Sequence, residues 1–284
     1  LQYLTLSQAD KLAYAKTLGI LPSEFIDLSA SEADSIISWI MAGSLHFGQS
    51  AYLALEALLT DAGISFERVE LAKRLIMTDI LAGVITPLEE GDLVISIYAL
   101  KRVAAYYGLN TDGFKVTYSV LKQTYDSACA QSSTTPCAFR FVAHINGNHF
   151  VIITEVTDTE VSYIDPGAGP ENAQDVRVVS KDAFLATWVS SLSLNGDNGT
   201  SVSGNSNGAV QQGFGYIFSA RAPPENAPAS EFKKLTAPEQ MEVRGAFFPL
   251  LVFVALAIAN AVVAAVTATL AVVSAIISGL VAGI

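Results

Sequence analysis

The sequence predicts an α+β fold in which helices come first and an antiparallel sheet follows. Segments with apolar residues at helical spacing, three of them ending at a glycine, fill residues 1–108, whereas residues 139–166 have the pattern of two successive hairpins. Helices followed by antiparallel strands are typical of the α+β class. The chain of 284 residues is 51% hydrophobic and 15% charged, a composition that indicates a folded protein.

The helical part begins with residues 1–45, where Ser7 and Ser31 each resemble a helix start. Residues 50–62 (SAYLALEALLTDA) form a strongly apolar predicted helix that ends at Gly63. Two more predicted helices, residues 67–83 and 94–108, also end at glycines.

Predicted strands follow in the second half of the chain. They cover residues 115–120, 139–145, 149–156, 160–166, 174–180 and 213–221, and a short helix is predicted over 181–189. Asn146-Gly147 joins two β-branched, apolar runs and is a strong signal for a two-residue hairpin loop. Such a loop would place His144 directly opposite His149.

Charge and cysteine content limit the function. A net charge of −11 argues against electrostatic binding of nucleic acid. No cofactor or metal is expected: His144 and His149 with Asp165 resemble part of a zinc site, but no further ligand supports one, and a structural role for His144 is favoured. Cys129 and Cys137 flank a short loop. The sequence is compatible with a disulfide between them and also with two free thiols.

His149 and Asp165 are the candidate catalytic pair. If the second turn is centred on Thr157, the two side chains face each other across neighbouring strands. An imidazole held by a carboxylate is two-thirds of a nucleophilic triad.

The surrounding residues resemble a known family. The likeness lies in Ala143-His144, Gly147-Asn148-His149-Phe150-Val151, Tyr163-Ile164-Asp165-Pro166, and Phe184 with Trp188. These resemble the bacteriocin-processing cysteine peptidases, which cut double-glycine leaders and have a papain-like fold. The resemblance implies helices packed on an antiparallel sheet, over roughly residues 44–220.

The resembled family carries its nucleophilic Cys at the start of the first long helix, and here that position is Ser50. Its oxyanion-stabilising Gln is expected where Ser44 stands, and the nearest Gln is Gln49. A Ser hydroxyl needs His149 as a true general base. Ser50 is therefore a candidate nucleophile or a helix N-cap, and a catalytically degenerate domain is a serious alternative.

Residues 235–246 resemble the leader end that this family cuts. The matching residues are Leu235, Thr236, Glu239, Val243, Gly245 and Ala246, while Gln240 departs from an apolar consensus. Read physically, Thr236 and Glu239 form a capping box, and a short helix is predicted to run to Gly245. Cleavage would fall between Ala246 and Phe247.

We predict four regions: helices in 1–43, the peptidase-like domain in 44–221, a linker and leader-like helix in 222–246, and a hydrophobic segment in 247–284. The last segment carries no charge and is long enough for a transmembrane span. The expected partners are a leader peptide in cis or in trans, the membrane, and a separate export transporter. The expected location is membrane-associated, with the peptidase-like domain in the cytoplasm.

Three functions stay open. The first is a leader peptidase that uses Ser50, His149 and Asp165, with its own 245–246 site as one substrate. The second is a degenerate module that binds a leader without cutting it. The third is a precursor that presents its hydrophobic C-terminal peptide.

Overall fold

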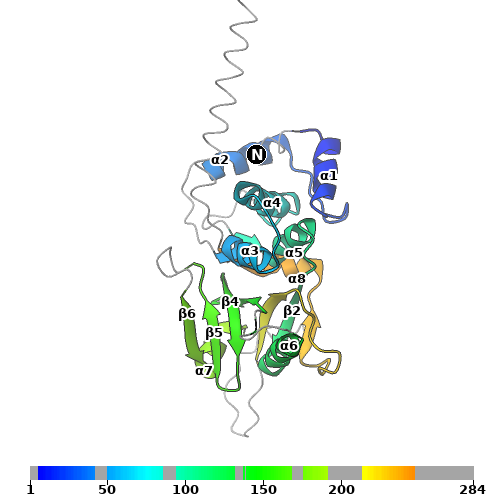
Figure 1. The fold of residues 1–284 in the computed structure, drawn as a ribbon. Helices are drawn as coiled ribbons and strands as arrows, with labels where there is room; N and C mark the ends of the chain where they lie inside the picture. Colours follow the sequence, from blue (N-terminus) through cyan, green and yellow to red (C-terminus); the bar gives the residue numbers. More distant parts are fainter. Residues whose placement is uncertain are drawn as a thin grey trace, which may run out of the picture. The chain divides into compact units, whose positions relative to one another are not determined.

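The computed structural model describes residues 6–41, 50–85, 94–131, 137, 139–167, 175–190 and 213–246, all within one compact unit, Leu1–Phe248 (Figure 1). Its helices are α1 (Gln8–Thr17), α2 (Ala30–Met41), α3 (Ser50–Asp61), α4 (Arg68–Leu81), α5 (Ile97–Tyr106), α6 (Tyr118–Ala130), α7 (Lys181–Trp188) and α8 (Ala237–Glu242). Its strands are β1 (Val94–Ser96), β2 (Asp112–Thr117), β3 (Phe141–Ile145), β4 (His149–Val156), β5 (Glu160–Ile164), β6 (Val176–Ser180), β7 (Val189–Ser190), β8 (Phe214–Ser219), β9 (Phe232–Lys234) and β10 (Arg244–Ala246).

The predicted α+β class is confirmed, because helices precede an antiparallel sheet. Eight strands form one sheet in the order β6-β5-β4-β3-β8-β2-β9, with β7 paired to β8. A separate two-stranded sheet joins β1 to β10. We call these the large sheet and the small sheet.

The core of the large sheet is built from alternating strand residues and two helices. Apolar side chains of β3, β4 and β8, among them Phe141, Val151 and Ile217, are fully buried. Helix α6 packs on β2 and β4, and α7 packs on β3, β5, β6 and β8. From α7, Phe184 and Trp188 stack in this core with ring centroids 5.3 Å apart, and the Trp188 indole donates to the Tyr216 carbonyl at 3.1 Å.

Several predicted elements need correction. Residues 94–96 are strand β1 and not the start of a helix, because α5 begins only after Ser96, whose hydroxyl accepts the N–H of Ala99 as an N-cap. The strand predicted at 115–120 ends at Thr117, which caps the unpredicted helix α6. The helix predicted to run to Gly245 ends at Glu242, and residues 244–246 form β10.

The hairpin loop between β3 and β4 is one residue longer than predicted. Asn146 and Gly147 both have positive φ, as expected for this turn, but the ladder closes with Ile145 opposite His149. Asn148 therefore belongs to the loop, and His144 lies opposite Phe150 and not opposite His149.

The sequence left open whether Cys129 and Cys137 are paired. In the structure they form a disulfide.

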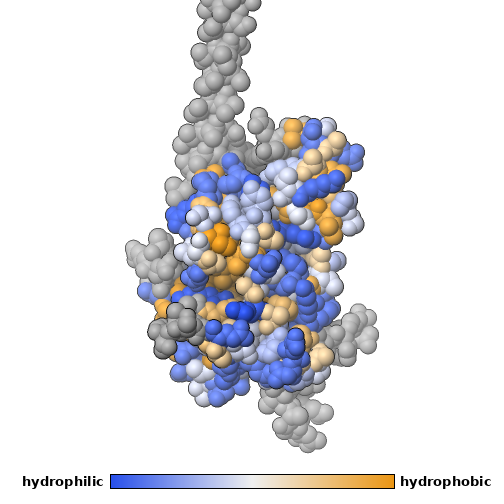
Figure 2. Space-filling model, turned by 45° about the vertical axis from the view of Figure 1, so that its right-hand side comes forward, coloured by the Kyte–Doolittle hydropathy of each residue, from blue (hydrophilic) through white to orange (hydrophobic). Residues whose placement is uncertain are grey.

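Hydrophilic residues dominate the face shown in Figure 2, and apolar residues there form separate patches. No helix among the described residues is both long and apolar enough to cross a bilayer, and the predicted membrane segment 247–284 lies outside those residues.

Candidate active site and leader-like segment

His149 and Asp165 lie together at one end of the β4–β5 hairpin. His149 opens β4, Asp165 directly follows β5, and Nε2 of the ring lies 2.7 Å from Oδ1 of the carboxylate. An ionised carboxylate only accepts hydrogen bonds, so Nε2 carries the proton and Nδ1 is the basic nitrogen of the neutral ring. Arg177 on β6 contacts the other carboxylate oxygen at 3.2 Å. The carboxylate is thus fixed from both sides and orients the imidazole.

A glycine makes this contact sterically possible. Strands β4 and β5 pair as far as Ile152 opposite Ile164, and a continuation of this register would place Gly167, not Asp165, across from His149. A Cβ at Gly167 would lie 2.6 Å from Cε1 of His149, and the Gly167 N–H donates to Oδ1 of Asp165 at 3.0 Å. The pair therefore meets diagonally, which is a correction to the directly opposed arrangement expected from the sequence.

Ser50 lies beside β4, the strand that carries His149. It is the first residue of α3, which packs on β4, and its side chain is completely buried. The N–H of Phe150, the residue after His149, donates to Ser50 Oγ at 3.1 Å. The structure therefore brings the start of the predicted nucleophile helix to the strand of the predicted base. Ser44 and Gln49 lie outside the described residues.

The leader-like segment, residues 235–246, folds onto the same region. Strand β10 pairs antiparallel with β1, with Ala246 opposite Val94 and Gly245 opposite Ile95. Strand β10 also contacts α3 and β4, the two elements that carry Ser50 and His149. His144 Nε2 lies 2.6 Å from the carbonyl oxygen of Arg244. The predicted cut site is thus an extended strand next to the candidate catalytic elements.

The predicted leader residues hold this segment in place. Leu235 and Val243 are buried, and the Glu239 carboxylate accepts the N–H of Thr236 at 2.9 Å. Gln240, which departs from the leader pattern, is also buried, and its Nε2 donates to the Leu235 carbonyl at 2.8 Å. The buried amide is therefore satisfied within the segment itself.

Gly113 of β2 forms part of the surface under the segment. A Cβ there would come within 2.8 Å of Ile97, 3.2 Å of Leu235 and 3.5 Å of Gln240. Its carbonyl accepts the N–H of Leu235 at 2.9 Å. The missing side chain therefore allows the segment to approach β2 closely.

Comparison with known proteins gives one family match. Residues 89–194 match the Peptidase C39 family. This part of the chain is therefore similar in sequence to that family. His149 and Asp165 lie inside the matched range, whereas Ser50 and residues 235–246 lie outside it.

No curated protein sequence matches this chain. Among solved structures, it is similar to a double glycine motif protease from an AMS/PCAT transporter, crystallised in complex with the leader peptide. That similarity has a TM-score of 0.36 and 12% sequence identity, and it covers 62% of this chain and 85% of the other.

A buried carboxylate that the sequence did not lead us to expect fixes β1. Asp79 of α4 is completely buried and accepts the Ser96 N–H at 2.7 Å and the Ser96 hydroxyl at 2.6 Å. Burial raises the pKa of Asp79 to about 7, although the Ser96 hydrogen bonds oppose this shift. An acidic residue inside the apolar run LIMTDIL was the signal that could have revealed it.

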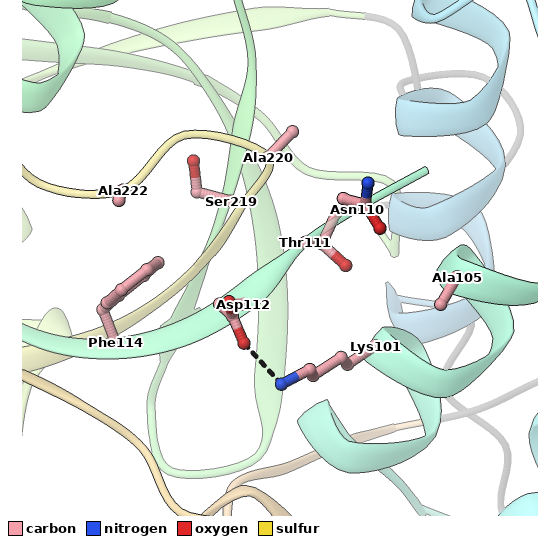
Figure 3. Close-up of a pocket in the computed structure, with 9 residues that line it drawn as sticks. All are labelled: Lys101, Ala105, Asn110, Thr111, Asp112, Phe114, Ser219, Ala220 and Ala222. Atoms are coloured by element: carbon pink, nitrogen blue, oxygen red, sulfur yellow. Dashed lines mark ion pairs between the residues drawn. The ribbon is translucent and has the colours of Figure 1, made fainter. Parts of the chain in front are cut away.

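The lining of a cavity of about 380 Å³ includes none of the candidate catalytic residues. It lies between α5, the start of β2 and the end of β8, and Figure 3 shows Lys101 and Asp112 pointing toward each other in it. Lys101 contacts Asp112 at 2.5 Å, and Lys234, directly before the leader-like segment, contacts the other oxygen of Asp112 at 2.6 Å. This ion-pair group therefore anchors the strand that leads into the segment.

His144 lies in a buried position opposite Phe150, and not opposite His149 as the sequence predicted. It is buried, its ring packs against Phe150 with centroids 5.1 Å apart, and its polar contact is the Arg244 carbonyl. Burial lowers the pKa of His144. Within the described ranges, no group of three or more His, Cys, Asp or Glu side chains is arranged to hold a metal ion.

Proposed function

We propose that this protein is a leader-peptidase-like protein that binds residues 235–246 of its own chain and cleaves after Ala246. The observation that carries the proposal is strand β10, which pairs with β1 and contacts both α3 and β4. Addition of an extended segment to an exposed strand is a common way of binding peptides. Here the added strand ends at the small Gly245-Ala246 pair, next to the elements of Ser50 and His149.

In the proposed reaction, Ser50 Oγ adds to the carbonyl carbon of Ala246 while Nδ1 of His149 takes the hydroxyl proton. The tetrahedral intermediate collapses, the bond to the Phe247 nitrogen breaks, and His149 returns the proton to the leaving amine. Water, deprotonated by the same histidine, then hydrolyses the ester and regenerates Ser50. The contact between His149 and Asp165 at 2.7 Å supports the role of Asp165 in orienting the ring.

A second function, binding without cleavage, is favoured by the environment of Ser50. Its hydroxyl oxygen accepts the N–H of Phe150 and is fully buried. Accepting a hydrogen bond draws electron density away from a nucleophilic oxygen, and a Ser hydroxyl is already much less acidic than a thiol. In that case the C39-like domain is a module that holds a leader-like helix and strand.

Mass spectrometry of the purified full chain separates the two functions. The proposed peptidase yields a fragment that ends at Ala246, and Ser50→Ala slows its appearance by roughly 10³ or more. Ser7→Ala, which removes the N-cap hydroxyl of α1, is the matched control and leaves cleavage unchanged. Ser50→Cys accelerates cleavage, because a thiolate is the better nucleophile.

Each outcome decides between the alternatives. An intact chain in the wild type, with cleavage in Ser50→Cys, would identify a binding module that has lost only its nucleophile. An intact chain in both would contradict any peptidase role. A fragment that appears equally in Ser50→Ala would show that Ser50 is not the nucleophile.

Cleavage would release residues 247–284, which carry no charge. We propose that this segment either anchors the protein in a membrane or is presented as a hydrophobic peptide, with the C39-like domain on the cytoplasmic side and a separate export transporter as partner. The proposed substrate is the leader-like segment in cis, and the leader peptide of another chain is the alternative partner in trans.

A further inference from the structure

The leader-like segment is attached to the large sheet before it reaches the candidate active site. Strand β9 pairs with β2, with Lys234 opposite Phe114, and the next residue, Leu235, donates its N–H to the Gly113 carbonyl at 2.9 Å. Lys234 also contacts Asp112. The segment therefore continues directly from an edge strand of the domain that it occupies.

The surface under the segment is complementary to it along its length. Helix α8 packs on α5 and β1, and the Val243 carbonyl accepts the N–H of Ile97 at 2.9 Å. Strand β10 then forms the second strand of the small sheet, and within the described part of the chain β1 pairs only with β10. A leader that paired with the edge of β1 used by β10 would have to take the place of β10.

Cleavage after Ala246 does not remove this occupant. The residues that fill the surface, 235–246, lie on the N-terminal side of the bond, and β9 keeps them joined to the domain. A tethered segment acts at an effective concentration on the order of millimolar. A free leader would dissociate after cleavage, whereas this one stays next to its binding surface.

We infer that residues 235–246 are a resident competitor, which closes the leader-binding surface of this domain to the leaders of other chains before and after cleavage. The inference rests on the leader-docking part of the proposed function. It predicts that the domain acts once, on its own chain, and that processing in trans requires displacement of β10 from β1.

The test measures peptide binding, so that it does not depend on catalysis. The full chain carrying His149→Ala is titrated with a fluorescent peptide of residues 233–250, and fluorescence anisotropy gives its affinity. Val243→Asp places a charge at a buried position of the segment and should displace it, whereas the peptide keeps the native Val. We expect Val243→Asp to bind the peptide at least tenfold more tightly than the parent chain.

Glu242→Ala is the matched control, because Glu242 is the exposed neighbour of Val243 and the change should leave the peptide affinity of the parent chain unaltered. If circular dichroism shows that Val243→Asp does not fold, Leu235→Ala replaces it and should still bind more tightly than Glu242→Ala. Equal affinities of the parent and the opened variant, or no binding to either, would overturn the inference.

The two proposals fail separately. Cleavage is scored by mass on the chain that retains His149. Cleavage together with equal peptide affinities overturns only the resident competitor. An uncleaved chain with the expected ranking of affinities overturns only the hydrolysis.

Discussion

The two sheets of this protein differ in the origin of their strands. In the large sheet, β3, β4, β5 and β6 are consecutive in the chain and each pairs with the next. The small sheet joins Val94 to Ala246, residues that are 152 positions apart (246 − 94). Hairpins close short loops, whereas the small sheet depends on a contact that forms only when the rest of the domain is in place.

This difference assigns separate tasks to the two sheets. The large sheet holds His149 and Asp165 in a fixed geometry through its own hydrogen-bond ladder. The small sheet exists only when the leader-like segment is docked. Damage to the large sheet should therefore unfold the domain, and damage to the small sheet should release the segment.

The largest expected effect concerns Asp79, which fixes β1 of the small sheet. Because burial raises its pKa from 3.8 to about 7, the folded state binds this proton more tightly than the unfolded state. The contribution of Asp79 to stability should therefore fall as the pH rises from 4 to 7, with a slope approaching the one-proton limit of about 1.4 kcal/mol per pH unit. Asp79→Asn should remove this slope, as measured by urea unfolding at several pH values.

Asp158 provides the control for this change, because its side chain is 90% exposed. Asp158→Asn should keep the slope of the wild type. If Asp79→Asn also keeps it, the buried carboxylate does not control the pH dependence.

The next effect tests the large sheet. A Cβ on Gly215 would lie 2.2 Å from the Trp188 ring, which is fully enclosed. Gly215→Ala should lower the free energy of unfolding by about 3 kcal/mol, because the tightly packed core must move. Gly147→Ala, in open space but at a φ of +75°, should cost about 1 kcal/mol. Similar losses in the two variants would mean that the Trp188 contact relaxes easily.

The smallest effect concerns the hydrogen bond that joins the two sheets. His144→Ala removes the donor to the Arg244 carbonyl and should cost about 1 kcal/mol, whereas His144→Gln can keep an amide donor there. Hydrogen exchange of the Ile97 amide, which donates to the Val243 carbonyl directly before β10, reports the loss at the end of the small sheet. Unchanged exchange in His144→Ala would show that the bond does not hold β10.

The same bond has its own pH dependence. Burial lowers the pKa of His144, so the folded state favours the neutral ring. This contribution is present above pH 6.5 and should be lost as the pH falls through the lowered pKa of the folded state. The direction is opposite to that of Asp79.

Local patterns predicted the candidate pair but not its exact register. Asn146-Gly147 and the alternating strands identified the hairpins that carry His149 and Asp165. The added loop residue Asn148 and the position of the second turn, which is centred between Asp158 and Thr159 and not on Thr157, have no clear composition signal, so the opposed positions were wrong. Helix α6 was missed because the run KVTYSV has the residues of a strand and only the cap at Thr117 ends it.

The docked strand could not be predicted from local sequence. Arg244-Gly245-Ala246 has no strand propensity, and it becomes a strand because β1 offers it an edge. Residues 94–96 were assigned to a helix because three apolar or small residues fit the pattern of a helix as well as that of a strand. The motif at 235–246 therefore indicated what the segment resembles, but only the fold indicates where it binds.

The disulfide between Cys129 and Cys137 links the end of α6 to the chain that enters β3, the strand of His144. Such bonds persist in oxidising compartments and are rare in the cytosol. The cytoplasmic side, where the sequence led us to expect this domain, is therefore the side on which the cross-link would be lost. Reduction would free the chain that enters β3, whose His144 contacts the Arg244 carbonyl. The redox state of the compartment would therefore affect how firmly the leader-like segment is held.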